Sequence, residues 1–281
     1  MFLFLDFLKE QLTISVVDIG AASMGPGTDA YGPLLKYPQT IVCGFEPNAD
    51  ACAARNAAAA PNQRYLPYFI GDGSSRTFFV CENPLTSSLY EPDAALLARF
   101  QRLDLPVRGR EPVQTTRLDD AGVAAVDYLK LDIQGAEIDA ISGGPKTIAQ
   151  ALVIHTEVEF IPMYKGQGLF GDVDVALRRH GFMFHNFVGL FSRQYKPLQY
   201  NNDPFSAGSQ LLFAEAAVYV RDLSRIDALP RDQLLKFATI MHDIYRAYDL
   251  VAHLLEALDR GGGGEEVARY VRSLTAGQAV D

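Results

Sequence analysis

Cysteine is scarce in this sequence, and its scarcity excludes a disulfide-stabilised protein. The 281 residues contain 3 cysteines, an odd number, and Cys43, Cys52 and Cys81 lack the spacing of metal ligands. This pattern predicts reduced thiols in a cytoplasmic protein, with Cys43 inside a buried strand.

Basic residues are also in short supply. Lys and Arg number 25 against 34 Asp and Glu, which leaves a formal net charge of −9. Such a chain repels a phosphate backbone, and no cluster of Lys or Arg along the sequence offsets this locally. Nucleic acid is therefore not an expected partner.

A long hydrophobic run is missing as well. The apolar N-terminal stretch is interrupted by Asp6, follows no basic residue and is too short to span a bilayer. We expect neither a signal peptide nor a transmembrane segment here. The stretch predicts an N-terminal helix packed on the core, with surface attachment to a lipid-linked substrate as the alternative.

Alternating strands and helices dominate the first 220 residues. Strands are predicted at 14–19, 40–45, 64–70, 126–131, 151–157, 182–187 and 210–220. Helices are predicted between them at 28–36, 49–60, 135–142 and 173–180. This βαβ alternation predicts an α/β fold with a mostly parallel sheet.

Two regions depart from the alternation. Residues 76–116 are predicted to be an insertion that covers the ligand cleft, with a hairpin, a loop, a helix near 92–100 and a short strand. Residues 222–281 are predicted to be a C-terminal helical extension to a domain at 1–221. Its helices are expected at 230–259 and 265–273, separated by a flexible glycine linker at 261–264.

Three predicted strands end in a carboxylate, at Asp18, Glu46 and Asp132. In an open α/β sheet the first βα loop and the acid after the second strand face one ligand, so Glu46 is expected to accept the two hydroxyls of a ribose. Residues 25–30 fit the G-x-G-x-x-A pattern of a dinucleotide site. However, this match begins several residues after the strand, and Asp18 would repel a pyrophosphate.

S-adenosylmethionine suits these acids better, because it has no phosphate and carries an ammonium and a sulfonium. A cleft edged by Asp18, Glu46, Asp72 and Asp132 would attract both cations. Asp72, after the third predicted strand, is expected near the adenine.

Four segments resemble the ordered motifs of the FkbM-type S-adenosylmethionine-dependent methyltransferases. They are Asp18-Ile-Gly-Ala, Phe45-Glu-Pro-Asn, Leu129-Lys-Leu-Asp-Ile-Gln-Gly-Ala-Glu and His155-Thr-Glu-Val-Glu-Phe. The resemblance implies the Rossmann-like class I methyltransferase fold, a seven-stranded sheet with an antiparallel last strand. It also implies O-methyl transfer, often to sugars or polyketide products. The cofactor-binding residues on this interpretation are Asp18, Gly20, Ala21, Glu46, Asn48, Asp72 and Asp132.

The sequence departs from these motifs at two places. Gln134 stands where the family's D-x-E-G-x-E block usually has an acid, which argues against an essential base or metal ligand there. The first loop, Ala21-Ala-Ser-Met-Gly-Pro-Gly27, is longer than the family form. This extra length leaves open which glycine approaches the methionine moiety.

Methyl transfer to a hydroxyl needs a group that accepts its proton, and the catalytic candidates are Asp132, His155 and Glu157. Asp132 comes first and His155 competes with it. Asp132, Glu157 and Glu159 could together hold Mg²⁺, although nothing in the spacing demands a metal. Glu137 is expected to complement a helix dipole, and Lys130 to form an ion pair that supports the sheet.

The sequence therefore predicts an S-adenosylmethionine-dependent O-methyltransferase that acts on a hydroxyl of a saccharide or natural product. The alternatives are an NAD-dependent oxidoreductase and a non-catalytic S-adenosylmethionine-binding protein. The expected partner is a small-molecule or glycan acceptor, and a homo-oligomer remains open.

Overall fold

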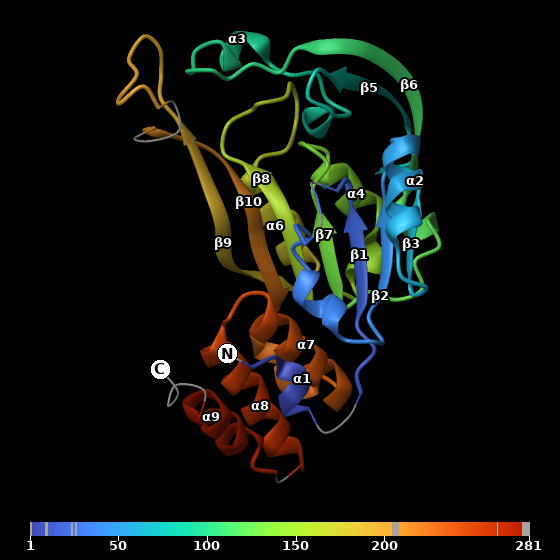
Figure 1. Ribbon diagram of the computed structural model, residues 1–281, viewed down its shortest axis with the longest axis vertical. Helices are drawn as coiled ribbons and strands as arrows, with labels where there is room; N and C mark the ends of the chain where they lie inside the picture. Colours follow the sequence, from blue (N-terminus) through green and yellow to red (C-terminus); the bar gives the residue numbers. More distant parts are fainter. Residues whose placement is uncertain are drawn as a thin grey trace.

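A seven-stranded sheet forms the centre of the protein (Figure 1). The computed structural model describes residues 2–8, 11–23, 25, 27–203, 208–262 and 264–276. The sheet comprises β1 (Ser15–Ile19), β2 (Ile41–Phe45), β3 (Gln63–Leu66), β7 (Tyr128–Leu131), β8 (Val153–Glu159), β9 (Phe182–Arg193) and β10 (Gln210–Arg221). Their order is β3-β2-β1-β7-β8-β10-β9; β10 runs antiparallel to both β8 and β9, and the other neighbouring strands pair in parallel. The predicted sheet with an antiparallel last strand is confirmed.

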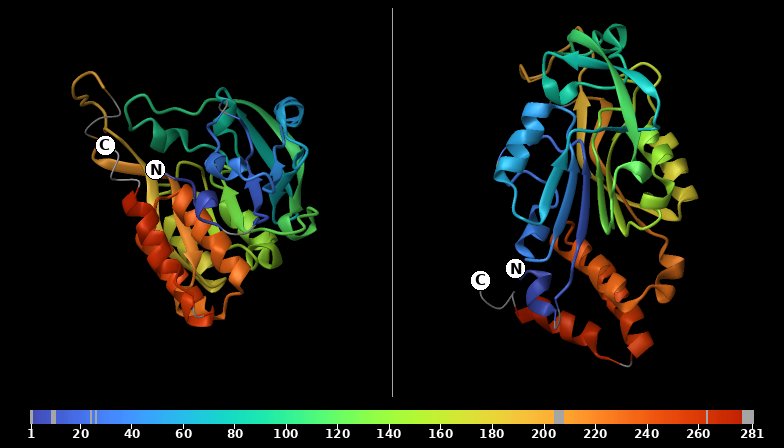
Figure 2. Two further views of the ribbon diagram at one scale, coloured as in Figure 1. Left: turned by 60° about the horizontal axis from the view of Figure 1, so that its bottom comes forward. Right: turned by 90° about the vertical axis from the view of Figure 1, so that its right-hand side faces the viewer.

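Helices cover both faces of the sheet. Figure 2 (right) shows α2 (Ala49–Ala58, light blue) on one side and α4 (Glu137–Gly143) and α6 (Phe170–Arg179) on the other. The short helix α5 (Pro145–Ile148) follows α4. Residues of β1 are buried on both faces, as a strand between two helical layers must be. Adjacent strand residues therefore belong to different cores: Val16 to one and Val17 to the other.

A second sheet, in the order β4-β6-β5, lies beyond the carboxyl ends of the central strands (Figure 1). Its strands are β4 (Phe69–Gly71), which precedes the insertion expected at 76–116, and β5 (Ser75–Cys81) and β6 (Val107–Arg117). Between β5 and β6 lie η2 (Pro84–Thr86) and α3 (Ala94–Leu97), and η3 (Leu118–Asp120) follows β6. The prediction of one strand at 64–70 is wrong. Pro67 lacks the N–H that a continuing ladder needs, and the chain leaves the central sheet after Leu66. The expected short strand is the eleven-residue β6, and the helix near 92–100 is only α3.

The C-terminal helices lie at the opposite end of the sheet, together with the N-terminus (Figure 1). They are η4 (Leu223–Ala228), α7 (Arg231–Asp243), α8 (Tyr248–Gly262) and α9 (Glu266–Ala276). Phe237 and Leu254 share one core with Val16 and Tyr128 of the sheet. The N-terminal helix α1 (Phe4–Phe7) packs there as predicted, with Phe4 and Phe7 buried. Within the described part of the chain, no helix is long and apolar enough to cross a membrane.

Three helix predictions need correction. Only Gly32–Lys36 of the expected helix at 28–36 forms, as the 3-10 helix η1, because the segment begins beside Gly27 with its φ of 78°. The expected helix at 230–259 is broken near Arg246, which has a φ of 54°. Gly261 and Gly262 form the last turn of α8 instead of a linker, and Gly263 lies outside the described residues.

Candidate active site

The acids predicted from the sequence converge at the carboxyl ends of β1, β2 and β7. The close approach of two strand ends depends on Gly20, whose φ is 82°. A Cβ atom at this position would lie 1.9 Å from the backbone oxygen of Asp132. Gly20 and Ala21 also both donate their N–H groups to the carbonyl of Phe45, which draws the first loop towards the end of β2. Met24 and Pro26 of this loop lie outside the described residues.

Lys130 joins the strand ends through its ammonium group. Its Nζ lies 3.2 Å from Oδ1 of Asp18, 3.3 Å from Oδ2 of Asp132 and 3.3 Å from the carbonyl oxygen of Gly20. Burial alone would lower the pKa of Lys130, but the two carboxylates raise it above its ordinary value. Lys130 is therefore a permanent cation between Asp18 and Asp132, two of the predicted site acids. It forms the predicted ion pair, but it does so inside the group of acids.

Asp18 lies beneath the crevice and not at its edge. Its side chain is 2% exposed, and Oδ2 accepts a hydrogen bond of 2.9 Å from the hydroxyl of Tyr31. Arg55 donates to the same hydroxyl at 2.8 Å and lies 3.8 Å from Oδ2. Burial raises the pKa of Asp18, and Lys130 opposes that rise. Asp18 is therefore held by Lys130, Tyr31 and Arg55 and fixes the position of the Lys130 ammonium group.

Glu46 follows β2 in a buried position that is consistent with ribose binding. Its Oε1 accepts a hydrogen bond of 2.8 Å from the N–H of Asn48, and among the described residues no donor is found for Oε2. Burial raises the pKa of Glu46. Asn48 uses its side chain to accept the N–H of Ala51 as the N-cap of α2.

Asp72 is separated from these acids by the change of sheet after Pro67. It follows β4, and its Oδ1 accepts hydrogen bonds from Ser74, from the N–H at 2.9 Å and the hydroxyl at 2.5 Å. These bonds to Ser74 lower the pKa of Asp72. The expected place near the adenine rested on Asp72 ending a strand of the central sheet, which it does not do.

Asp132 and Glu157 form a pair bridged by an amide. Nε2 of Gln134 donates to Oδ1 of Asp132 at 3.1 Å and to Oε2 of Glu157 at 2.6 Å. The side chain of Asp132 is 39% exposed, whereas Glu157 is buried. Desolvation opposes ionisation of Asp132, but Lys130 and the amide hold its pKa below the ordinary value. Burial and the charge of Asp132 raise the pKa of Glu157 well above its usual range.

Two further carboxyls lie under this pair. Glu137, in the first turn of α4, accepts the N–H of Ile133 at 2.9 Å, and burial raises its pKa to about 7. Glu159 is buried, and its pKa is also raised well above the usual range by desolvation and by Glu137. No three acidic, histidine or cysteine side chains gather as metal ligands within the described ranges. The hypothesis of Mg²⁺ between Asp132, Glu157 and Glu159 therefore finds no support.

His155 is on the same face of the sheet as Lys130 but is closed off by the C-terminal extension. Its side chain is buried, and Nδ1 lies 3.1 Å from the hydroxyl of Tyr245, which also lies 3.2 Å from the hydroxyl of Tyr128. Burial, with Lys130 nearby, lowers the pKa of His155 to about 3. His155 is thus neutral and enclosed, while Asp132 is ionised and accessible.

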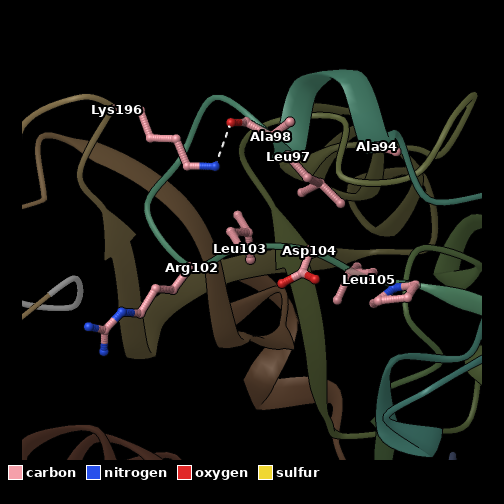
Figure 3. Close-up of a pocket in the computed structure, with 9 residues that line it drawn as sticks. Ala94, Leu97, Ala98, Arg102, Leu103, Asp104, Leu105 and Lys196 are labelled. Carbon is pink, nitrogen blue, oxygen red and sulfur yellow. Dashed lines mark hydrogen bonds between the residues drawn. The ribbon is translucent and has the colours of Figure 1, made fainter.

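Two surface hollows lie away from these acids. The first hollow has a volume of about 420 Å³, and its lining includes Leu97, Leu103 and Asp104 of the insertion (Figure 3). Lys196 lies beside it, and Nζ of Lys196 donates a hydrogen bond of 2.9 Å to the carbonyl of Ala98. The second, of about 570 Å³, lies where α6 ends, β9 begins and β10 ends, and its lining includes Arg178, Arg179, Arg221 and Arg225. Folding thus creates a basic cluster that the sequence order does not reveal.

Sequence reasoning missed the aromatic and cationic partners of the acids. Tyr31 and Arg55 hold Asp18, Tyr164 holds Gln134, and Tyr245 reaches His155 from the C-terminal extension. Only Tyr164 had a signal, since the segment Tyr164-Lys-Gly-Gln-Gly-Leu-Phe170 after β8 also resembles the family. The others belong to segments without a recognisable motif.

The strand order and the acids at the ends of β1, β2 and β7 define a class I methyltransferase fold. The family described as the methyltransferase FkbM domain matches residues 18–184. This match covers more than half of the chain, and the protein belongs to the FkbM methyltransferase domain family.

Similar proteins agree with this assignment. The chain is 31% identical over 167 residues to the 2-O-methyltransferase NoeI of Sinorhizobium fredii (strain NBRC 101917 / NGR234). That alignment covers 54% of this chain and 66% of NoeI, just under two thirds of the relative.

Solved structures show a more distant likeness. A methyltransferase FkbM from Methylobacillus flagellatus KT matches with 15% identity and a TM-score of 0.39, over 76% of this chain and 44% of that chain. LepI, in a complex with S-adenosylmethionine, matches with 11% identity and a TM-score of 0.33, also over 76% and 44%. The fold assignment therefore depends on strand order and family, not on these superpositions.

Proposed function

We propose that the protein is an S-adenosylmethionine-dependent O-methyltransferase that acts on a hydroxyl of a saccharide or natural product. The observation that carries this proposal is the position of Glu46 and Asp132 after β2 and β7, the two strands that flank β1, with Lys130 bound to Asp132 and the Asp132 side chain 39% exposed. Membership of the FkbM family supports methyl transfer, and the name of the relative NoeI supports transfer to oxygen. The acceptor is proposed to be a small molecule or glycan in the cytoplasm.

The residues at the crevice fit the cofactor. Bound S-adenosylmethionine would supply an electrophilic methyl group on a sulfonium. Glu46 keeps Oε2 for a ribose hydroxyl, since only its Oε1 is bonded to Asn48 among the described residues. Three carboxyl groups, Asp18, Glu46 and Asp132, stand against two cations, Lys130 and Arg55, and this excess of acids suits a cationic ligand.

Asp132 is the proposed acceptor of the hydroxyl proton. It is ionised at neutral pH and 39% exposed, so an acceptor hydroxyl can reach it. Lys130 holds one carboxylate oxygen at 3.3 Å and Gln134 the other at 3.1 Å, which fixes the orientation of the group. Burial and the charge of Asp132 raise the pKa of Glu157, which favours the protonated form of Glu157 beside the Asp132 anion. His155, enclosed against Tyr245, is the less suitable base.

Isothermal titration with S-adenosylhomocysteine and, separately, with NAD tests the cofactor. The proposal predicts saturable binding of S-adenosylhomocysteine and none of NAD. Binding of NAD alone would support the oxidoreductase alternative. Tight S-adenosylhomocysteine binding without methyl transfer to any fraction of a cell extract would support a non-catalytic binding protein.

A further inference from the structure

Gln134 has a backbone conformation that its side chain does not favour. Its φ is 55°, in the left-handed region, and Gly135 follows with a φ of 93°. Left-handed φ values are uncommon for residues other than glycine, asparagine and aspartate, and they persist where surrounding contacts enforce them. The contacts of Gln134 should therefore explain why a glutamine stands here.

The side chain of Gln134 satisfies two carboxyl groups at once. One amide nitrogen donates to both Asp132, at 3.1 Å, and Glu157, at 2.6 Å. A primary amide has two N–H groups, so each carboxyl group receives its own donor. A carboxylate at this position would have no proton to give and would place a further negative charge beside the Asp132 anion.

The other side of Gln134 is bound to the insertion. Its Oε1 lies 3.1 Å from the hydroxyl of Tyr164, which also lies 3.0 Å from the carbonyl of Thr86 and shares its single proton between them. The carbonyl oxygen of Gln134 accepts a hydrogen bond of 2.6 Å from the hydroxyl of Ser88. Oγ of Ser88 in turn accepts the N–H of Tyr90 at 3.0 Å. Side chain and backbone of one residue therefore attach residues 86–90 to the acid pair.

Ionisable groups surround this junction from several elements. They are Lys130 and Asp132 from β7 and its end, Glu137 from α4, Glu157 and Glu159 from β8, and Tyr164 after β8. Asp132 carries the anion in this group, and its neighbours Glu157 and Glu159 have raised pKa values. A neutral amide between Asp132 and Glu157 adds hydrogen bonds without adding charge.

We propose that Gln134 is a positioning residue that couples the insertion to the proton acceptor: its amide orients Asp132 while its carbonyl groups hold residues 86–90 in place. If the contacts between Gln134 and residues 86–90 weaken, the contact between Gln134 and Asp132 also weakens, and the reverse holds. Residues 86–90, which border the acceptor, and Asp132, which takes its proton, therefore keep a fixed relative position. The importance of this coupling for methyl transfer depends on the proposed function. The coupling itself is a property of the folded chain and can be measured without an acceptor.

Hydrogen–deuterium exchange over residues 85–90, compared in wild type and Gln134→Leu, tests the attachment directly. We expect exchange at these amides to be at least about 10-fold faster in Gln134→Leu. The variant removes the side-chain bonds to Asp132, Glu157 and Tyr164 that hold the left-handed backbone in place, and this backbone presents the carbonyl group to Ser88. Gln150→Leu is the matched control, since Gln150 is exposed and, among the described residues, its side chain makes only a 3.4 Å bond to the carbonyl of Lys146. Ser88→Ala and Tyr164→Phe, which keep the packing, serve as second variants if Gln134→Leu does not fold.

Gln134→Glu allows a measurement that distinguishes positioning through hydrogen bonds from a purely structural role of Gln134. A protonated glutamic acid can still donate one hydrogen bond, whereas its anion cannot. The protection of amides 85–90, taken relative to the intrinsic exchange rate at each pH, should therefore fall as pH rises in this variant and not in wild type. Carbon-13 NMR of labelled aspartate carboxyls should also show Asp132 titrating at higher pH in Gln134→Leu than in wild type.

Equal exchange in wild type, Gln134→Leu and Ser88→Ala would overturn the proposal, as would an unshifted titration of Asp132. Titration with S-adenosylhomocysteine separates this result from the proposed function. If wild type fails to bind it while the exchange differences persist, the methyltransferase assignment fails and the coupling stands. If binding persists and the exchange differences are absent, the coupling alone is wrong.

Discussion

Replacement of Lys130 by methionine should remove a large part of the stability of the fold. Lys130 pairs with Asp18 at 3.2 Å, and the side chain of Asp18 is 2% exposed, so water cannot replace the lost cation. Removing one partner of a buried ion pair typically destabilises a protein by about 3 to 5 kcal/mol. Tyr31, at 2.9 Å, and Arg55, at 3.8 Å, still contact Asp18. We therefore expect Lys130→Met to lower the free energy of unfolding by about 3 kcal/mol, the lower end of this range.

The second ion pair of Lys130 adds little to this figure. Asp132 is 39% exposed and is solvated after the substitution, so its share should be below about 1 kcal/mol. The effect should also depend on pH. Without Lys130 the pKa of Asp18, already raised by burial, rises further, and a protonated Asp18 needs no cation. The difference in the free energy of unfolding between wild type and Lys130→Met should therefore become smaller as pH falls.

Urea denaturation followed by far-ultraviolet circular dichroism measures the effect, because the chain contains no tryptophan for fluorescence. Lys165→Gln is the matched control: Lys165 pairs with Glu91 at 3.0 Å on the surface, and its loss should leave stability nearly unchanged. The double variant Asp18→Asn/Lys130→Met should recover much of the loss. If Lys130→Met unfolds within about 1 kcal/mol of wild type, the argument for a buried, dependent Asp18 is refuted.

Four further outcomes are expected. Glu46→Ala should weaken S-adenosylhomocysteine binding by about 1.5 to 3 kcal/mol in a calorimetric titration, and unchanged affinity would place the crevice elsewhere. Asp132→Asn should lower methyl transfer by at least about 10²-fold while the protein stays folded; near-full turnover in this variant, with activity abolished in His155→Gln, would transfer the role of base to His155. Burial lowers the pKa of His155 to about 3 in the folded protein, against about 6.5 in the unfolded chain. The unfolded chain therefore gains a proton at His155 before the folded protein does, and the free energy of unfolding decreases as the pH falls below about 6.5. Wild type should lose about 2 kcal/mol more than His155→Gln between about pH 7 and pH 5 in urea titrations, and equal losses would show that His155 is not held neutral. Truncation after Arg221 should cause aggregation, because α7 and α8 cover apolar residues of the sheet, and a soluble, compact product in size-exclusion chromatography would argue against that packing.

The sheet was predictable because its parallel strands are short apolar runs buried on both faces. Residues 15–19 and 41–45 read as strands for this reason, and the acids that follow them mark their carboxyl ends. The end of the strand at Pro67 was also predictable, since proline lacks the N–H that a β-ladder needs. The apolar residues on both sides of Pro67 instead suggested one continuous strand. Asp72 was assigned to the crevice as a consequence.

The site was less predictable because its electrostatics depend on contacts between distant segments. The position of Asp132 follows from its strand, whereas the enclosure of His155 depends on Tyr245, 90 residues further along the chain. The departure at Gln134 was visible in the sequence, but its link to Ser88 was not. Tertiary packing, and not local pattern, decides which carboxyl group is ionised.

Transfer of a labelled methyl group is the most direct test of the methyltransferase account. The protein would be incubated with methyl-labelled S-adenosylmethionine and with methyl glycosides or fractions of a cell extract, and the products analysed by mass spectrometry. We predict a product labelled on a hydroxyl oxygen that forms with wild type and falls at least about 10²-fold with Asp132→Asn. A label on nitrogen or carbon, or no labelled product while S-adenosylhomocysteine binds tightly, would contradict the account.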